Sequence, residues 1–349
     1  MDCRCQRTFF YLAYILSYKT PKTRSGGIVM KRYIFVRNAF LSLIATLLLL
    51  TVGVASILAE EQKPAATPAP ATAAPAPTTD APAPAAPAED RPTGSLAISG
   101  LSKYVWRGYE NTRNSVVVQP SLTVGYKGFS ANVWGNIDTK PYSTTDASYS
   151  STWTETDLTL SYTKTFGILN AGLGYIYYGL QAPNAGAVKP LDAQEIFVTL
   201  GLNTLLTPTL TAYKEIDHYH QYYFLLGVSH TFEFNKTISL QLSASASYLL
   251  SDYADATLYG VNASYGGYPK FNDNYQATND KFSNFHDGVI TASLPINVAK
   301  YLTVAPTVSY SFPLSSDAKN EIKARGKLTN PADNDSSYVY GGLTVTLSF

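Results

Sequence analysis

The sequence predicts an all-β fold, a transmembrane up-and-down antiparallel β-barrel of about 12 strands. Segments of about ten residues with alternating polar and apolar side chains follow one another from Ser95 to Phe349, and this is the length of a tilted membrane-spanning strand. Tight turns and longer polar loops alternate between these segments. Only 15% of the residues are charged and 27 are tyrosines, which suits a sheet with one face in lipid.

The N-terminal region resembles an export signal rather than part of the barrel. Met30 is followed by basic residues, an apolar run and a stretch of small residues, the layout of a secretory signal peptide. We therefore expect residues 1–29 to be an over-extended N-terminus and residues 30–59 to be the signal peptide. An uncleaved transmembrane anchor is the alternative. Both cysteines, Cys3 and Cys5, precede Met30, so the exported chain would have no disulfide and no thiolate metal site.

The next segment, residues 60–93, is rich in proline and alanine. Such a composition cannot bury a core and favours extended polyproline II, so we expect a disordered periplasmic linker before a barrel over residues 94–349. Without residues 1–59, acidic side chains outnumber basic ones. This balance argues against a nucleic-acid partner, because phosphate backbones are bound mainly through Lys and Arg.

The expected strands alternate with period two, and no stretch after Pro92 has a convincing helical period. In the clearest strand, Leu240 and Leu242 lie on the face opposite Gln241 and Ser243. In the seventh strand Lys214 interrupts the apolar face. The strands are expected at residues 95–108, 116–127, 129–138, 154–163, 169–178, 195–203, 207–216, 222–232, 238–250, 287–296, 302–312 and 337–349.

Closure of the sheet follows from the lack of water in lipid, where every backbone N–H and C=O must be paired. Short turns would lie at the periplasmic end and long loops, at about residues 252–283 and 313–336, at the extracellular end. A soluble β-sandwich also alternates and is the competing fold. Aromatic residues of the apolar faces are expected to form an interfacial girdle. They are Tyr104, Trp106, Tyr126, Tyr162, Tyr310 and Phe349.

The last strand ends in the sequence "LTVTLSF", with an aromatic residue at Phe349. It resembles the closing strand of bacterial outer-membrane barrels, in which a terminal aromatic residue is read by the barrel-insertion machinery. The resemblance implies that Phe349 is part of an insertion signal and that the machinery is a partner.

The first strand contains "SKYVWRG", from Ser102 to Gly108. This segment is similar to the S-x-Y-x-x-R-G opening strand of the TorF-like family of porins in Gram-negative bacteria. The matching residues are Ser102, Tyr104, Arg107 and Gly108. The resemblance covers about residues 95–349 and implies a porin-like transport channel.

Charged residues that parity places in the lumen have both signs. They are Lys103, Arg107, Lys127, Glu155, Asp157, Glu195 and Asp287. Opposite charges in one pore would create a polar constriction in a narrow channel. The alternative is an internal salt-bridge network that plugs a non-conducting barrel. The acidic excess suggests a mild preference for cations.

The function expected from these features is passive diffusion of small hydrophilic solutes through the outer membrane. The alternative is a non-conducting outer-membrane barrel that acts as an anchor or adhesin through its long extracellular loops. An enzyme is not expected. His218 and His220 lie beside Asp217 in "EIDHYHQ", but two imidazoles and one carboxylate are too few for a metal site. No catalytic residue, metal or cofactor is assigned, and the oligomeric state is open.

Overall fold

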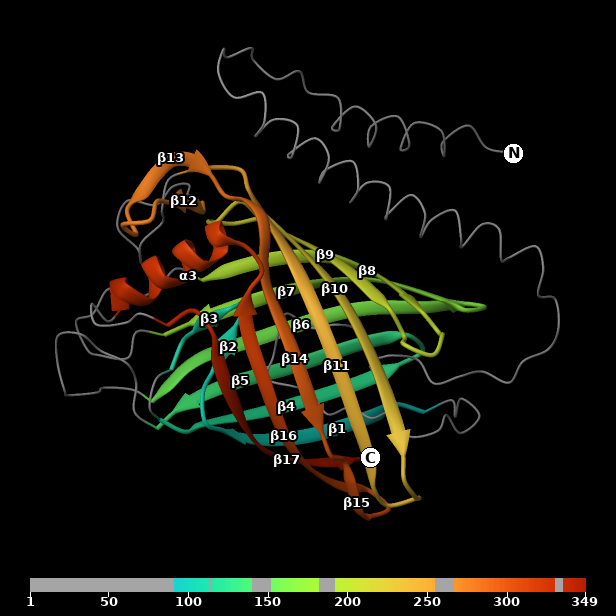
Figure 1. Cartoon of the computed structure of the whole chain (residues 1–349). Helices are drawn as coiled ribbons and strands as arrows, with labels where there is room; N and C mark the ends of the chain where they lie inside the picture. The colour runs from blue at the N-terminus through green and yellow to red at the C-terminus, as the bar shows by residue number, and fades with distance from the viewer. Residues whose placement is uncertain (1–90, 113–114, 140–151, 182–191, 255–266, 330–334) are drawn as a thin grey trace, which may run out of the picture. The chain divides into compact units, whose positions relative to one another are not determined.

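The computed structural model in Figure 1 describes residues 91–112, 115–139, 152–181, 192–254, 267–329 and 335–349. The expected N-terminal extension and signal peptide, and the linker up to residue 90, lie outside the described residues. No helix in the described part of the chain is both long and apolar enough to cross a bilayer.

Twelve antiparallel strands form one closed sheet, so the predicted fold class and strand number are confirmed. Neighbours in the sequence of barrel strands are neighbours in the sheet, and pairing of β1 with β17 closes the ring. The barrel strands are β1 (Thr93–Leu101), β4 (Val117–Tyr126), β5 (Phe129–Asp138), β6 (Trp153–Phe166), β7 (Leu169–Leu180), β8 (Ala193–Leu202), β9 (Thr209–Glu215), β10 (Gln221–Glu233), β11 (Ser239–Ser251), β14 (Ser283–Ser293), β16 (Leu302–Pro313) and β17 (Tyr338–Ser348).

The seam between β1 and β17 is closed by backbone pairing along its length. Ser95 lies opposite Ser348, and Leu101 lies opposite Gly342. At the end of the seam Gly94 and Phe349 exchange two N–H···O bonds of 2.7 and 2.8 Å. The ring therefore has no free edge that would leave backbone groups unpaired in lipid.

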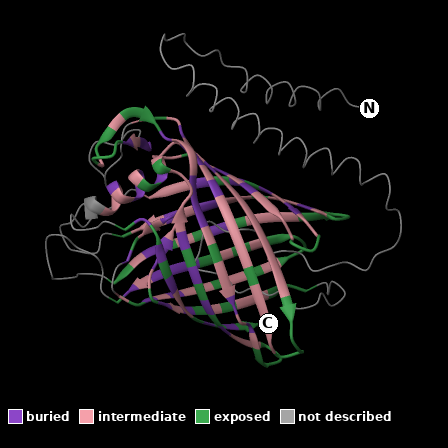
Figure 2. Ribbon diagram, viewed as in Figure 1, coloured by how far each residue is buried: buried purple, intermediate pink, exposed green. Residues whose placement is uncertain are grey.

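Burial alternates along the barrel strands, as the period of two predicts (Figure 2). On β6 the side chains of Leu158 and Leu160 are 37% and 46% exposed, whereas Thr159 between them is 6% exposed. Inward hydroxyl groups bond to one another between strands, as in the 2.8 Å contact of Ser99 with Thr344. The outside of the barrel is thus apolar and the inside carries hydroxyl groups.

The two ends of the barrel also differ. One end has tight turns, including the β4–β5 turn, in which Lys127 and Gly128 both have positive φ as in two-residue hairpins. The short strand β15 (Ile296–Ala299) lies in the connection between β14 and β16 at this end. The opposite end carries β12 (Pro269–Phe271), β13 (Ala277–Lys281) and helix α3 (Ser316–Thr329) (Figure 1).

Helix α3 contradicts the expectation that the chain has no helix after Pro92. Its buried side chains are both apolar and charged: Ala318 and Ile322 are buried together with Glu321. Because a charged residue shares the buried face, the sequence lacks the apolar stripe that identifies an amphipathic helix. Ser315 begins the helix, since its Oγ accepts a hydrogen bond of 3.1 Å from the N–H of Ala318.

The first strand is shorter than expected, because β1 ends at Leu101 instead of continuing to Gly108. Tyr104 is 4% exposed and Trp106 is half-buried against Tyr178, a residue of the lumen. The prediction that these two aromatic residues belong to a lipid-facing girdle is therefore wrong. Tyr126, Tyr310 and Phe349 are exposed on the outside as predicted.

A hairpin across the lumen as the candidate functional site

The segment after β1 turns into the barrel and forms a small hairpin, which we call the lumen hairpin (residues 102–110). Its strands are β2 (Val105–Trp106) and β3 (Tyr109–Glu110), which pair with each other and not with the barrel wall. Arg107 and Gly108 form the turn, with φ of 48° and 83°. A Cβ at Gly108 would lie 3.0 Å from atoms of both Asp287 and Ile322, so glycine suits the turn sterically as well as conformationally.

The lumen hairpin reaches across the barrel through Arg107. Its two terminal guanidinium nitrogens donate to the two carboxylate oxygens of Glu195 on β8, both at 2.7 Å. Strands β4 to β7 separate β1 from β8 along the shorter way around the ring. The hairpin leaves one wall and is therefore held on a distant wall by a bidentate ion pair.

Aromatic rings enclose the Arg107–Glu195 pair. The guanidinium carbon lies 4.6 Å from the centre of the Trp106 ring and 4.2 Å from that of Tyr223. The hydroxyl of Tyr178 donates to Glu195 at 2.9 Å. Because both charges are removed from water, the pair depends on these contacts as well as on its mutual attraction.

A second buried cluster connects the barrel wall to helix α3. Asp287 accepts hydrogen bonds from Tyr223 at 2.9 Å and Ser247 at 2.7 Å. The Nδ1 atom of the adjacent His286 lies 2.9 Å from Asp287, and its Nε2 atom lies 3.2 Å from Glu321 of α3. Tyr223 thus contacts both clusters, since its ring lies under Arg107 and its hydroxyl bonds to Asp287.

Helix α3 contacts the lumen hairpin through strand β3. Tyr109 of β3 donates a hydrogen bond of 2.9 Å to Glu321, which also pairs with Arg325. The Arg325 guanidinium lies 4.0 Å from the centre of the Tyr268 ring. Burial alone would raise the pKa of Glu321, but Arg325 and His286 outweigh it and hold that pKa below its usual value.

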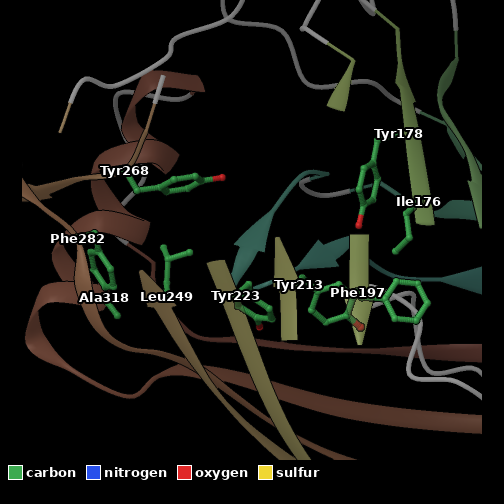
Figure 3. Close-up of a cluster of buried hydrophobic side chains, with 9 residues drawn as sticks. All are labelled: Ile176, Tyr178, Phe197, Tyr213, Tyr223, Leu249, Tyr268, Phe282 and Ala318. Carbon is green, nitrogen blue, oxygen red and sulfur yellow. The ribbon is translucent and has the colours of Figure 1, made fainter. Parts of the chain in front are cut away.

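Buried aromatic side chains pack close to these charges. Figure 3 shows Tyr223, Tyr213 and Phe197 in a row, on β10, β9 and β8. Neighbouring ring centres in this row are 6.1 and 5.6 Å apart. This packing forms a constriction of the lumen at the end of the barrel that carries β12, β13 and α3.

The structure brings together some of the predicted lumen residues and separates others. Arg107 meets Glu195, and Asp287 belongs to the second cluster. Lys103 pairs with Glu110 of the same hairpin at 2.6 Å. Lys127 is exposed in the β4–β5 turn, with its ammonium 5.1 Å from the centre of the Tyr126 ring. It lies at the end of the barrel and not in the lumen.

Glu155 and Asp157 face the lumen from β6, one buried and one half-buried. No Lys or Arg of a described barrel strand points inward, since Lys164 and Lys214 are on the apolar, outward face. Arg107 of the lumen hairpin is a cation inside the lumen, and it is paired with Glu195. The described lumen at the constriction is therefore richer in carboxylates than in Lys and Arg.

Toward the tight-turn end the lumen is lined by uncharged hydroxyl and amide groups. Asn132 donates hydrogen bonds of 2.8 Å to Ser121 and Thr123. Thr291 and Ser309 contact each other at 2.9 Å. Such groups bond equally well to water or to a hydroxylated solute.

Sequence reasoning missed Tyr109, Tyr223, Ser247, His286 and Glu321. Parity identifies Tyr223 and Ser247 as inward, but inward Tyr and Ser are common in any barrel. The pair Glu321 and Arg325 has the i, i+4 spacing of a helical ion pair, which was the available signal for α3.

The histidines singled out in the sequence lie in the β9–β10 turn. His218 Nδ1 is 3.0 Å from a carboxylate oxygen of Asp217. The turn is held from inside by Glu215, whose two oxygens accept four backbone N–H groups of residues 217–220. No group of at least three His, Cys, Asp and Glu side chains in the described residues could hold a metal ion.

The structure is similar to several solved outer-membrane proteins. These are the NanC porin (10% identity, TM-score 0.43, covering 72% of this chain and 98% of that chain), the KdgM porin (10%, 0.41, 73% and 99%) and OmpT of Vibrio cholerae (10%, 0.32, 74% and 97%). No protein-family model and no curated protein matches the sequence.

Proposed function

We propose that the chain is an outer-membrane channel for passive diffusion of small hydrophilic solutes, narrowed at its extracellular end by the lumen hairpin. The observation that carries the proposal is the closed barrel of 12 strands with an apolar outside and a hydroxyl-lined inside. Barrels of eight strands are filled by their own side chains, and 12 strands enclose a wider lumen.

The location in the outer membrane rests on two features. The barrel presents exposed apolar side chains around its outside, which fits lipid and not water. The expected signal peptide at residues 30–59 directs export, and the linker at residues 60–93 would lie in the periplasm with the tight turns. We expect the barrel-insertion machinery to recognise Phe349. This machinery and outer-membrane lipid are therefore the proposed partners.

The second candidate is a non-conducting barrel that anchors or adheres through its extracellular loops. It is favoured by the depth of packing around Arg107, whose side chain is 2% exposed in the lumen. In that case the lumen hairpin and α3 form a permanent plug. Membership in the TorF-like family, which the motif from Ser102 to Gly108 suggests, stays a prediction.

Planar-bilayer recording of the purified full chain separates the two candidates. A channel gives discrete current steps whose size grows with salt concentration. Folded barrel that inserts but passes no current at any voltage would overturn the channel and favour the anchor. Liposome swelling adds the solute range, because small sugars should enter and larger oligosaccharides should not.

A further inference from the structure

We propose that the tight-turn end of the barrel binds the headgroups of anionic phospholipids through a ring of lysines. The lysine ring comprises Lys127, Lys164, Lys236 and Lys300. The inference rests on membrane insertion of the barrel, which is part of the proposed function, but it does not require that the barrel conducts.

The members of the lysine ring lie in or beside four different turns around the barrel. Lys127 lies between β4 and β5, and Lys164 lies at the end of β6. Lys236 lies between β10 and β11, and Lys300 lies between β15 and β16. All four side chains are exposed. Because they are spread around the circumference, a partner docked on one side could not contact them all, whereas a shell of lipid could.

Aromatic side chains place the lysine ring at the boundary between lipid and water. Lys164 and Lys300 have their ammonium groups 5.4 and 4.7 Å from the centres of the Phe166 and Tyr301 rings. Phe129 lies beside the turn that contains Lys127, and Phe234 lies in the turn that contains Lys236. Both side chains are more than 60% exposed. Aromatic residues favour the headgroup level of a bilayer, so lysines beside them lie at the height of lipid phosphates.

Among the described tight turns, lysines outnumber acidic side chains. Within the described ranges, Glu233 is the acidic side chain found among the tight turns. At the opposite end two lysines are in ion pairs, Lys270 with Asp317 at 3.0 Å and Lys214 with Asp252 at 2.5 Å. A surplus of cations at the headgroup level attracts anionic lipid, each lysine adding to the binding.

The test is lipid titration of the full chain in detergent, followed by native mass spectrometry. Phosphatidylglycerol is the anionic probe and phosphatidylcholine the neutral one. The wild type should retain phosphatidylglycerol more strongly, by on the order of tenfold. Replacing all four members of the lysine ring by Gln should remove this preference.

The matched control replaces four lysines of the opposite end, Lys270, Lys281, Lys319 and Lys323, by Gln. It should keep the preference. If the ring variant fails to fold, the double variant K164Q/K300Q gives the same comparison with a smaller loss.

Three results would overturn the inference: equal retention of both lipids by the wild type, equal loss of the preference in the control, or an unchanged preference in the ring variant. A wild type that ignores phosphatidylglycerol but sediments with purified peptidoglycan would assign the lysine ring to the cell wall. Bilayer current is recorded separately, so a silent barrel that selects phosphatidylglycerol refutes the channel and not the lipid site.

Discussion

Arg107 and Glu195, 88 positions apart in the sequence, form a bidentate ion pair inside the barrel with both N–O distances at 2.7 Å. The pair joins the lumen hairpin, which follows β1, to the wall at β8. The lumen hairpin is thereby held across the lumen, with one end joined to β1 and the other bound to β8.

Replacing Glu195 by Gln should destabilise the folded barrel. The change leaves the buried guanidinium of Arg107 without its charge partner, and breaking a buried pair in this way costs about 3–5 kcal/mol. Urea unfolding from lipid vesicles measures the loss. The exposed Glu233→Gln variant should change the free energy of unfolding by less than about 0.5 kcal/mol. Equal stabilities for Glu195→Gln and the wild type would argue against the ion pair.

Replacing Arg107 by Ala should increase single-channel conductance. The substitution removes the ion pair with β8, so the lumen hairpin is no longer held across the lumen. Planar-bilayer recording compares the variant with Lys127→Ala, a change at the barrel end that should leave conductance unaltered. A lower or unchanged conductance in Arg107→Ala would show that the hairpin does not limit the flow.

Asp157 is expected to contribute to a preference for cations. It faces the lumen half-buried, close in sequence to the inward Glu155, and no described barrel strand places a Lys or Arg beside it. Reversal potentials in a KCl gradient should show cation selectivity that falls toward equal permeability in Asp157→Asn. The control is Asp217→Asn, in the β9–β10 turn. Anion selectivity in the wild type would contradict the expectation.

The docking of helix α3 should weaken in acid. The pKa of Glu321 is lowered in the folded state, so its ionised form stabilises that state. The stabilisation is fully present at pH values above the pKa of the unfolded chain, about 4.3. This stabilisation is lost as the pH falls through the lower folded pKa. Hydrogen exchange of α3 amides should therefore accelerate in acid beyond the intrinsic effect of pH. Glu321→Gln should show faster exchange already at neutral pH, and equal protection of α3 in variant and wild type would refute this role.

Gly94 should be required for tight closure of the seam. A Cβ at Gly94 would lie 2.4 Å from the ring of Phe349, which covers this glycine on the neighbouring strand. Gly94→Val should displace the ring and lower the unfolding temperature, at a cost of about 1–3 kcal/mol. Gly100→Ala is the matched control on β1, since nothing lies within 4 Å of its added Cβ. Equal unfolding temperatures for the two variants would contradict the prediction.

The alternation of side chains by itself determined that this chain forms a closed barrel, how many strands it has and which face each strand turns to lipid. Those properties depend on a period of two within each segment and on the requirement that lipid leaves no backbone group unpaired. The same local rule misplaced Lys127, because parity has no meaning in a turn with positive φ.

The lumen hairpin and helix α3 were decided by the tertiary structure. Tyr104 and Trp106 continue the apolar parity of the first strand, but burial against Trp134 and Tyr178 inside the barrel outweighs the lipid-facing position. Arg107 finds its partner on β8, and Glu321 finds His286 on β14. These contacts join residues that are far apart along the chain and are brought together by closure of the barrel. The alternation of neighbouring side chains therefore cannot predict them.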